Sequence, residues 1–161
     1  VPGTGATFHV YFPAIDTSPP RRTRMPMAEA NGRERILLID DEVMLAEMEQ
    51  SMLERLGYQV TICTGSQAAL ALFRQNPQRF DAVITDQTMP EMTGMDLARR
   101  MLEIRPELPI ILCTGYSSLI NEQQARASGL QGFAMKPLSN RELAQLLRQV
   151  LNNDAENEKI R

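Results

Sequence analysis

The sequence contains no tryptophan, one histidine and only two cysteines, Cys63 and Cys113. Zinc sites are built from cysteine and histidine at short characteristic spacings, and no such spacing is present. A zinc site is therefore poorly supported. The residues that remain for metal chemistry are the acids considered below.

Long apolar runs and an excess of basic residues are also missing. The longest apolar stretches fall far short of the ~20 residues that span a bilayer. Lys and Arg (17) do not outnumber Asp and Glu (20), so non-specific affinity for nucleic acid has no support across the whole chain. The chain begins at Val1 and lacks the zones of a signal peptide. We therefore expect a fragment of a longer cytoplasmic polypeptide, with no membrane contact and no nucleic-acid partner.

From Arg35 onward, apolar runs alternate with amphipathic stretches, which is typical of repeated strand–helix units. Five such units can be counted, and 161 residues leave room for one compact domain with tails. The expected strands are short and apolar, as strands buried on both faces should be: 35–39, 58–63, 80–85, 109–113 and 132–135. The expected fold class is α/β, with a parallel five-stranded sheet.

The helical stretches carry their own start and stop signals. Gly57 follows the first helix as a C-terminal cap would, and Ser139 with Glu142 forms a capping box before the last helix. The fourth helix, over 118–127, has a weak apolar stripe and is expected to be the least tightly held. Methionines in the helical patterns are expected to pack in the core rather than bind a metal or a partner: Met44, Met48, Met52 and Met101.

The two ends of the chain differ in character from this domain. Residues 14–34 contain several prolines and little periodicity, which indicates a flexible linker. Residues 153–161 form a short polar tail. The folded domain is expected to cover residues 35–152.

Polar side chains gather where the expected strands end. Asp40 and Asp41 follow the first strand, Asp86 ends the third, Thr114 ends the fourth and Lys136 ends the fifth. In parallel α/β sheets the functional crevice forms beyond the carboxyl ends of the strands. The sequence therefore predicts one site that contains three carboxylates, a hydroxyl and an ammonium.

Like charges at such a site need compensation. Two carboxylates about 4 Å apart repel by about 4 kcal/mol at an effective dielectric of 20, so the acids would bind protons or recruit a cation. Hard oxygen ligands suit Mg²⁺, with Mn²⁺ as a possible substitute. Mg²⁺ beside a nucleophilic carboxylate, an ammonium and a hydroxyl is a set of parts for phosphoryl transfer. Asp86 would be the nucleophile that forms an acyl phosphate, Lys136 a positive point charge, and Thr114 a donor to a phosphoryl oxygen.

Each residue also has an ordinary structural explanation. Asp86 alone could form a turn, and Asp40 with Asp41 could cap the first helix. Thr114 could cap the fourth helix, and Lys136 could be a solvent-exposed lysine. The functional interpretation is preferred because these residues end strands one, three, four and five in order, where the crevice rule independently requires a site.

Four motifs, LLIDDE, ITDQTMPEMTG, LCTGYS and FAMKPL, make residues 35–151 resemble the receiver domains of bacterial response regulators. The resemblance implies a flavodoxin-like, doubly wound sheet of order 2-1-3-4-5 with helices on both faces. It also implies that Asp86 is the phosphoacceptor and that Asp41 binds the metal directly, with Asp40 acting partly through water. The main-chain carbonyl of Thr88 would be a further metal ligand.

The same resemblance assigns the remaining site residues. Thr114 would be the switch hydroxyl and Lys136 the conserved-type lysine, joined to Pro137 by a cis peptide bond. The switch aromatic, often tyrosine in the family, is Phe133 here, so an inward swing would lack a hydroxyl contact. With this strand order the two cysteines lie about 14 Å apart, beyond the ~7 Å limit for a disulfide, and both are expected to be buried thiols.

The first 13 residues, VPGTGATFHVYFP, resemble the closing strand of a histidine-kinase ATP-binding domain. A disordered tail is the alternative interpretation. The resemblance implies that the parent protein is a hybrid histidine kinase with this receiver at its C-terminus. The expected partners are then a histidine-kinase dimerisation domain or a histidine-phosphotransfer protein.

Taken together, the sequence predicts a signalling switch in which Asp86 accepts a phosphoryl group from phosphohistidine. Whether its autocatalysed phosphotransfer makes it an enzyme is left open. One rival is a binding module that never takes phosphate. A second is a hydrolase working through an aspartyl phosphate, but that class typically needs an acid two residues after the nucleophile, where this chain has Thr88.

Overall fold

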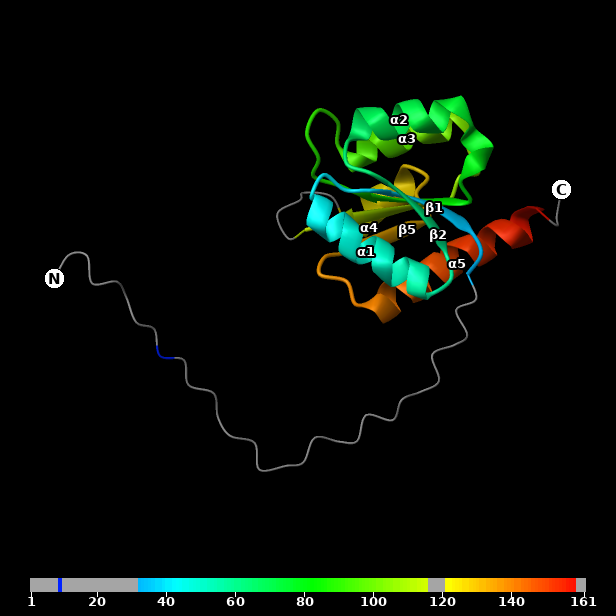
Figure 1. The fold of residues 1–161 in the computed structure, drawn as a ribbon. Helices are drawn as coiled ribbons and strands as arrows, with labels where there is room; N and C mark the ends of the chain where they lie inside the picture. The colour runs from blue at the N-terminus through cyan, green and yellow to red at the C-terminus, as the bar shows by residue number, and fades with distance from the viewer. Residues whose placement is uncertain (1–8, 10–31, 116–120, 159–161) are drawn as a thin grey trace.

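The computed structural model describes residues 9, 32–115 and 121–158 (Figure 1). The expected strand remnant over 1–13, apart from residue 9, and most of the expected linker lie outside these residues. The same is true of residues 118–120 of the expected fourth helix and of the last three residues of the expected tail. Among the described residues, no helix is both long and apolar enough to cross a membrane.

Five parallel strands form one sheet, in the order β2-β1-β3-β4-β5. This is the flavodoxin-like arrangement that the family resemblance implied, and the prediction is confirmed. The strands are β1 (Arg35–Ile39), β2 (Gln59–Cys63), β3 (Ala82–Asp86), β4 (Ile110–Thr114) and β5 (Gly132–Met135). The strands β1, β3 and β4 are apolar runs with side chains buried on both faces of the sheet, whereas the edge strand β2 is only partly buried.

Helices cover both faces of the sheet, as Figure 1 shows with α2 and α3 on one side and α1 and α5 on the other. The helices are α1 (Val43–Arg55), α2 (Ser66–Gln75), α3 (Gly94–Ile104), α4 (Glu122–Ala127) and α5 (Asn140–Glu158), with a short 3₁₀ turn, η1 (Pro77–Arg79), after α2. Helix α5 runs on past residue 152, where the folded domain was expected to end.

Two apolar cores lie on either side of the sheet, because alternate strand residues point to opposite faces. Leu37 and Val83 point toward the core that contains Phe73 of α2 and Met101 of α3. Ile36, Leu38 and Ile84 point toward the other core, which contains residues of α1 and α5: Met52, Leu53, Leu143, Leu147 and Val150. The polar residues that end the strands therefore lie beyond both cores, at the edge of the sheet.

The predicted start and stop signals of the helices are present. Gly57 adopts φ 95° and donates its N–H to the carbonyl of Glu54, which ends α1. Ser139 and Glu142 exchange hydrogen bonds as a capping box before α5. Helix α4 begins at Glu122 with a second capping box, formed by Asn121 and Gln124. Gln124, which interrupts the apolar stripe of this helix, therefore has a capping role.

The expected burial of two methionines is wrong. Met44 is 85% exposed and Met48 is 60% exposed, although Met52 and Met101 are buried as predicted. The row of α1 that faces the sheet runs through Ala46, Glu49, Met52 and Leu53. An acid therefore occupies a position of the buried row, and an apolar side chain next to it is exposed.

Neither cysteine forms a disulfide, as expected. Cys113 is fully buried on β4, whereas Cys63 is only half-buried because β2 is an edge strand. Burial raises the pKa of both thiols, so neither is poised as a thiolate at neutral pH.

Candidate functional site

The predicted site residues meet at the carboxyl edge of the sheet. The register pairs Asp86 with Cys113 and Thr114 with Met135, so the ends of β3, β4 and β5 are aligned. Asp40 directly follows β1, and Lys136 directly follows β5. We call five of these residues the carboxyl rim: Asp40, Asp41, Asp86, Thr114 and Lys136. Four separate segments of the chain therefore contribute side chains to one edge.

Lys136 joins two of the acids. Its Nζ lies 2.5 Å from Oδ2 of Asp40 and 2.6 Å from Oδ1 of Asp86. The side chains are 18% exposed for Lys136, 3% for Asp40 and 11% for Asp86, so all three groups are largely withdrawn from water. Burial alone would lower the pKa of Lys136, but the hydrogen bonds that its ammonium donates to the two carboxylates outweigh this effect and raise the pKa. The ammonium is therefore charged at neutral pH.

Main-chain groups fix the other oxygen of each carboxylate. Oδ1 of Asp40 accepts the N–H of Glu42 at 2.8 Å, and Oδ2 of Asp86 accepts the N–H of Thr88 at 2.5 Å. The main-chain N–H of Lys136 donates to the carbonyl of Thr114 at 2.8 Å. The peptide bond from Lys136 to the next residue is cis, as predicted. Each reactive side chain is therefore held by local backbone as well as by its ionic partner.

The loop after Asp86 is held close to the strand. The N–H of Gly94 donates to the carbonyl of Gln87 at 3.0 Å, and a Cβ at residue 94 would collide with the carbonyl oxygen of Asp86. The buried side chain of Gln87 accepts the N–H of Met95 at 3.1 Å. Only glycine fits at residue 94 in this arrangement.

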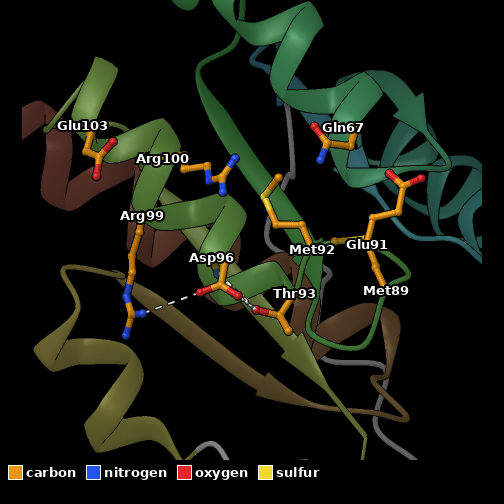
Figure 2. A pocket seen from close by; sticks show the side chains of 9 residues that line it. All are labelled: Gln67, Met89, Glu91, Met92, Thr93, Asp96, Arg99, Arg100 and Glu103. Carbon is orange, nitrogen blue, oxygen red and sulfur yellow. Dashed lines mark hydrogen bonds and ion pairs between the residues drawn. The ribbon is translucent and has the colours of Figure 1, made fainter.

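The start of α3 closes the same loop. Thr93 accepts the N–H of Asp96 at 3.2 Å and donates its hydroxyl to the Asp96 carboxylate at 2.7 Å (Figure 2). Arg99 lies 3.6 Å from that carboxylate, at the border of a surface hollow between α2 and α3. Asp96 is therefore engaged in capping α3.

Thr114 and Phe133 have different surroundings. Thr114 is buried at the end of β4, and its hydroxyl donates to the carbonyl of Gly115 at 3.2 Å. Phe133 is half-buried and packs against the core on the α2 and α3 side. Its ring therefore already contacts the interior in this structure. The roles of these two residues as switch residues stay predictions.

Gly94, Gln87 and Glu49 had no role predicted from the sequence. Gly94 ends the motif ITDQTMPEMTG, and its place after Thr93 was the feature from which a tight turn could have been predicted. Gln87 gave no signal, because its role depends on a contact with the next helix. Glu49 lies three positions before Met52 on the buried row of α1, so a correct helix phase would have found it.

The donor set of the rim has the chemistry of a hard-cation site. Asp40 and Asp86 each touch the same nitrogen, which brings one oxygen of each to within about 5 Å of the other. Carboxylate oxygens of this kind suit Mg²⁺. Asp41 is half-buried beside them, and the side chain of Thr88 is exposed. Within the described residues, however, no group of three or more His, Cys, Asp or Glu side chains is arranged to hold a metal ion.

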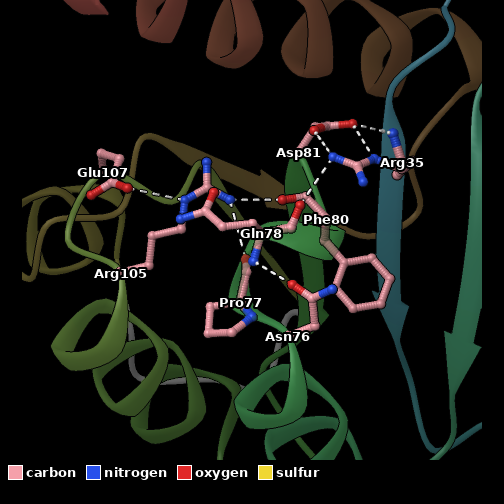
Figure 3. Close-up of polar contacts among 8 residues, drawn as sticks. All are labelled: Arg35, Asn76, Pro77, Gln78, Phe80, Asp81, Arg105 and Glu107. Atoms are coloured by element: carbon pink, nitrogen blue, oxygen red, sulfur yellow. Dashed lines mark hydrogen bonds and ion pairs between the residues drawn. The ribbon is translucent and has the colours of Figure 1, made fainter.

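The opposite edge of the sheet carries a separate set of charges (Figure 3). Arg105 donates to the carbonyl of Phe80 at 2.7 Å, and Arg35 forms an ion pair with Asp81 at 2.7 Å. The hydrogen bond from Arg35 holds the pKa of Asp81 below its usual range. These contacts tie the segment before β3 to β1 and α3, so they stabilise the fold at the far end of the strands.

The fold and the carboxyl rim define a receiver-type α/β domain with a lysine-bridged acidic site. The chain matches the family described as response regulator receiver domain over residues 36–148. It belongs to this family, and its domain is the receiver domain of a two-component response system.

Relatives with known names support this assignment. The chain is 31% identical over 117 residues to the two-component response regulator ARR10 of Arabidopsis thaliana. The aligned region covers 73% of this chain and 21% of that protein. It is 31% identical over 126 residues to the probable transcriptional regulatory protein TcrX of Mycobacterium tuberculosis, covering 78% of this chain and 53% of that protein. The chain thus spans between about a fifth and about half of these relatives.

Solved structures agree with the fold. A response regulator receiver domain protein from Clostridium thermocellum is similar with a TM-score of 0.70 and 31% identity, covering 79% of this chain and 98% of that one. A CheY-like receiver domain protein from Methanospirillum hungatei has a TM-score of 0.72 and 28% identity, covering 78% and 99%. Almost the whole length of each compared receiver domain is therefore matched by this chain.

Proposed function

We propose that Asp86 accepts a phosphoryl group from phosphohistidine of a partner protein. The observation that carries this proposal is the position of Asp86 at the rim, with one oxygen 2.6 Å from the Lys136 ammonium. A carboxylate oxygen attacks phosphorus, the bond from phosphorus to the imidazole nitrogen breaks, and its electron pair stays on that nitrogen. The product is an acyl phosphate on Asp86.

Lys136 is suited to stabilise the transferred group. Its ammonium already lies between two carboxylates, so it can shift toward phosphoryl oxygens without leaving the rim. Thr114 is at the end of the neighbouring strand, where its hydroxyl can turn from the Gly115 carbonyl to a phosphoryl oxygen. The added charge of about −1.5 to −2 would then change the contacts of both residues.

Mg²⁺, or Mn²⁺ in its place, fits this proposal. The residues that would hold it are Asp40, Asp41, Asp86 and the main-chain carbonyl of Thr88. When bound, the ion would neutralise charge on the carboxylates and the incoming phosphoryl group. Titration of isotopically labelled chain with Mn²⁺ tests the site without phosphorylation: amide signals of residues 40, 41, 86 and 88 should broaden first. Uniform broadening across the chain would contradict the assignment.

A partner helix has a surface on which to dock. Val43, Met44 and Met48 of α1 are exposed apolar side chains, and a groove separates this helix from the segment Lys136–Leu138. Because Lys136 also contacts Asp86, a helix that lies here brings its side chains to the rim. A histidine-kinase dimerisation domain or a histidine-phosphotransfer protein presents its histidine from a helix, so either fits this surface.

Loading with acetyl phosphate tests the proposed function. In the presence of Mg²⁺ the wild-type chain should gain the mass of one phosphoryl group, and Asp86→Asn should gain none. A chain that folds normally but never takes phosphate would be the binding module considered above. Brisk turnover of small phosphate esters would favour the hydrolase, and the exposed Thr88 at the position of the second acid argues against it.

We also propose that the parent protein is a hybrid histidine kinase acting in the cytoplasm. The support is the resemblance of the first 13 residues to the closing strand of a kinase ATP-binding domain. On this proposal residues 14–34 are the linker to the receiver, and no nucleic acid binds this chain, consistent with its net charge of −3. The relatives reported above are response regulators rather than hybrid kinases. The sequence encoded upstream of residue 1 therefore decides between the two kinds of parent protein. A kinase core encoded there is expected, and an unrelated domain would overturn the proposal.

A further inference from the structure

Glu49 is a buried acid that phosphoryl transfer at the carboxyl rim does not use. It lies on α1 and is only 6% exposed. Within residues 32–115 and 121–158, its carboxylate takes part in no hydrogen bond and no ion pair. The nearest ammonium, that of Lys136, is already engaged by Asp40 and Asp86. Glu49 is therefore an acid that the described part of the domain leaves without a direct hydrogen-bond or ionic partner.

Glu49 lies where a bound partner could reach its carboxylate. The side chain lines the groove between α1 and the segment Lys136–Leu138, a hollow of roughly 620 Å³. Five apolar side chains line the groove together with Ser51 and two cations, Arg55 and Lys136; the apolar ones are Leu45, Met48, Met52, Pro137 and Leu138. Glu49 is the one acid among the described residues that line the groove, which otherwise offers apolar contacts and a few polar groups that can orient a ligand.

Retaining a carboxylate there has a physical cost. Burial raises the pKa of Glu49, and the nearby carboxylates of Asp40 and Asp86 add to the rise while Lys136 opposes it. A leucine at this position would fill the buried row of α1 without that cost. The acid is therefore better explained by a contact made in a complex than by packing in the free domain.

We propose that Glu49 is a specificity-determining residue that accepts a guanidinium group from the helix docked on α1. This inference rests on the proposed function, because it assigns a chemistry to the same partner surface. Arginine fits better than lysine, because its planar fork binds a carboxylate through two parallel hydrogen bonds and it is more weakly hydrated. The apolar side chains of the groove would shield the pair from water and so strengthen it, against the opposing charges of Arg55 and Lys136. The partner is thus a helix that presents an arginine beside apolar side chains.

Selection from a displayed library tests this partner chemistry. Helical peptides randomised along one face are selected on the full wild-type chain and, separately, on Glu49→Gln and Glu47→Gln. Glu47 is an exposed acid on the same helix, so its substitution makes the same change of charge outside the groove. Wild type and Glu47→Gln should both enrich arginine at one position, whereas Glu49→Gln should not. Enrichment that survives in Glu49→Gln, or a failure to select any arginine-bearing binder on wild type, would overturn the proposal.

A matched pair of peptides then measures the effect. The selected peptide is compared with the same peptide carrying citrulline, which keeps the shape of arginine without its charge. Wild type should bind the arginine form about tenfold more tightly, equivalent to about 1.4 kcal/mol, and Glu49→Gln should bind both forms equally. Equal binding of the two forms by wild type would refute the pairing.

Two measurements separate the role of Glu49 from its effect on folding and from the role of Asp86. The free energy of unfolding of Glu49→Gln shows whether the variant is folded. Acetyl-phosphate loading of the wild-type chain tests Asp86 independently of any peptide. Loss of loading would therefore refute the proposed function, whereas loss of the arginine preference alone would refute only the role of Glu49.

Discussion

Replacement of Lys136 by methionine should destabilise the free domain strongly. The substitution removes contacts of 2.5 Å to Asp40 and 2.6 Å to Asp86 and leaves two largely buried carboxylates without their shared cation. The facing oxygens lie at most about 5 Å apart, and two unit charges at that distance repel by about 3 kcal/mol at an effective dielectric of 20. Without added divalent metal, the free energy of unfolding should therefore fall by about 3 kcal/mol at pH 7.

The effect of pH follows from the direction of the lysine shift. The folded-state pKa of Lys136 is raised, so the stability that it contributes is fully present below its unfolded pKa of about 10.4. That stability is lost only as the pH rises through the folded pKa. The difference between wild type and Lys136→Met should therefore stay constant from pH 7 to about pH 9.

Urea denaturation followed by far-ultraviolet circular dichroism measures this loss, because the chain has no tryptophan. The matched control is Arg126→Met, which removes an ion pair to Glu122 whose two side chains are each 57% exposed. It should cost less than about 0.5 kcal/mol. Adding Asp40→Asn to Lys136→Met should restore most of the lost stability. If Lys136→Met costs no more than the control, electrostatic compensation by Lys136 does not stabilise the rim.

Three further changes test other parts of the structure. Gly94→Ala should destabilise the domain by about 1–3 kcal/mol and slow acetyl-phosphate loading, because its methyl group displaces the loop against the Asp86 carbonyl. Arg105→Met should cost about 1–3 kcal/mol in urea denaturation, because it removes the donor to two main-chain carbonyls and an ion pair with Glu107. Loading should stay intact, because these contacts lie at the end of the strands opposite the carboxyl rim. Asp81→Asn should cost under about 1 kcal/mol at pH 7, since its partner Arg35 is nearly half-exposed. Because the pKa of Asp81 is lowered, that difference should begin to shrink as the pH falls below about 4 and vanish below the folded-state pKa; a constant difference would contradict the assignment.

The sheet was predictable because its cause is local. The strands β1, β3 and β4 are short apolar runs closed by a polar residue, and such runs, alternating with helical stretches, are typical of a parallel sheet covered by helices on both faces. Two strands, Arg35–Ile39 and Gly132–Met135, have the predicted boundaries, and the other three differ by one or two residues at their ends. The strand order came from the motifs, because periodicity does not specify which strands are neighbours.

The phase of α1 shows where local pattern fails. Met48 and Glu49 are adjacent, and hydrophobicity alone favours burial of the methionine. The structure buries Glu49 and exposes Met48, because the direction in which α1 meets the sheet is set by Ala46 and Leu53. Tertiary packing thus overrides the preference of single residues. A buried acid beside an exposed methionine is also the pattern from which the docking groove was inferred.

The sequence predicted which residues form the carboxyl rim but not which of them are in direct contact. The crevice rule placed Asp40, Asp86, Thr114 and Lys136 at one edge, and the structure brings Asp40, Asp86 and Lys136 into direct contact. Asp40 was expected to act partly through water at a metal ion. That role stays a prediction. The structure adds a contact of Asp40 with Lys136, which lies far from it in the sequence, so no short motif could predict this contact.

The proposed switch depends on Asp86 carrying the phosphoryl group as an acyl phosphate. Such a group is reduced by borohydride, which converts the modified aspartate side chain to an alcohol. The wild-type chain is loaded with acetyl phosphate and Mg²⁺, reduced, digested and analysed by peptide mass spectrometry. Reduction is expected at residue 86 and nowhere else. Reduction at Asp40 or Asp41, or none at residue 86 in a chain that has gained a phosphoryl group, would show that Asp86 is not the phosphoacceptor.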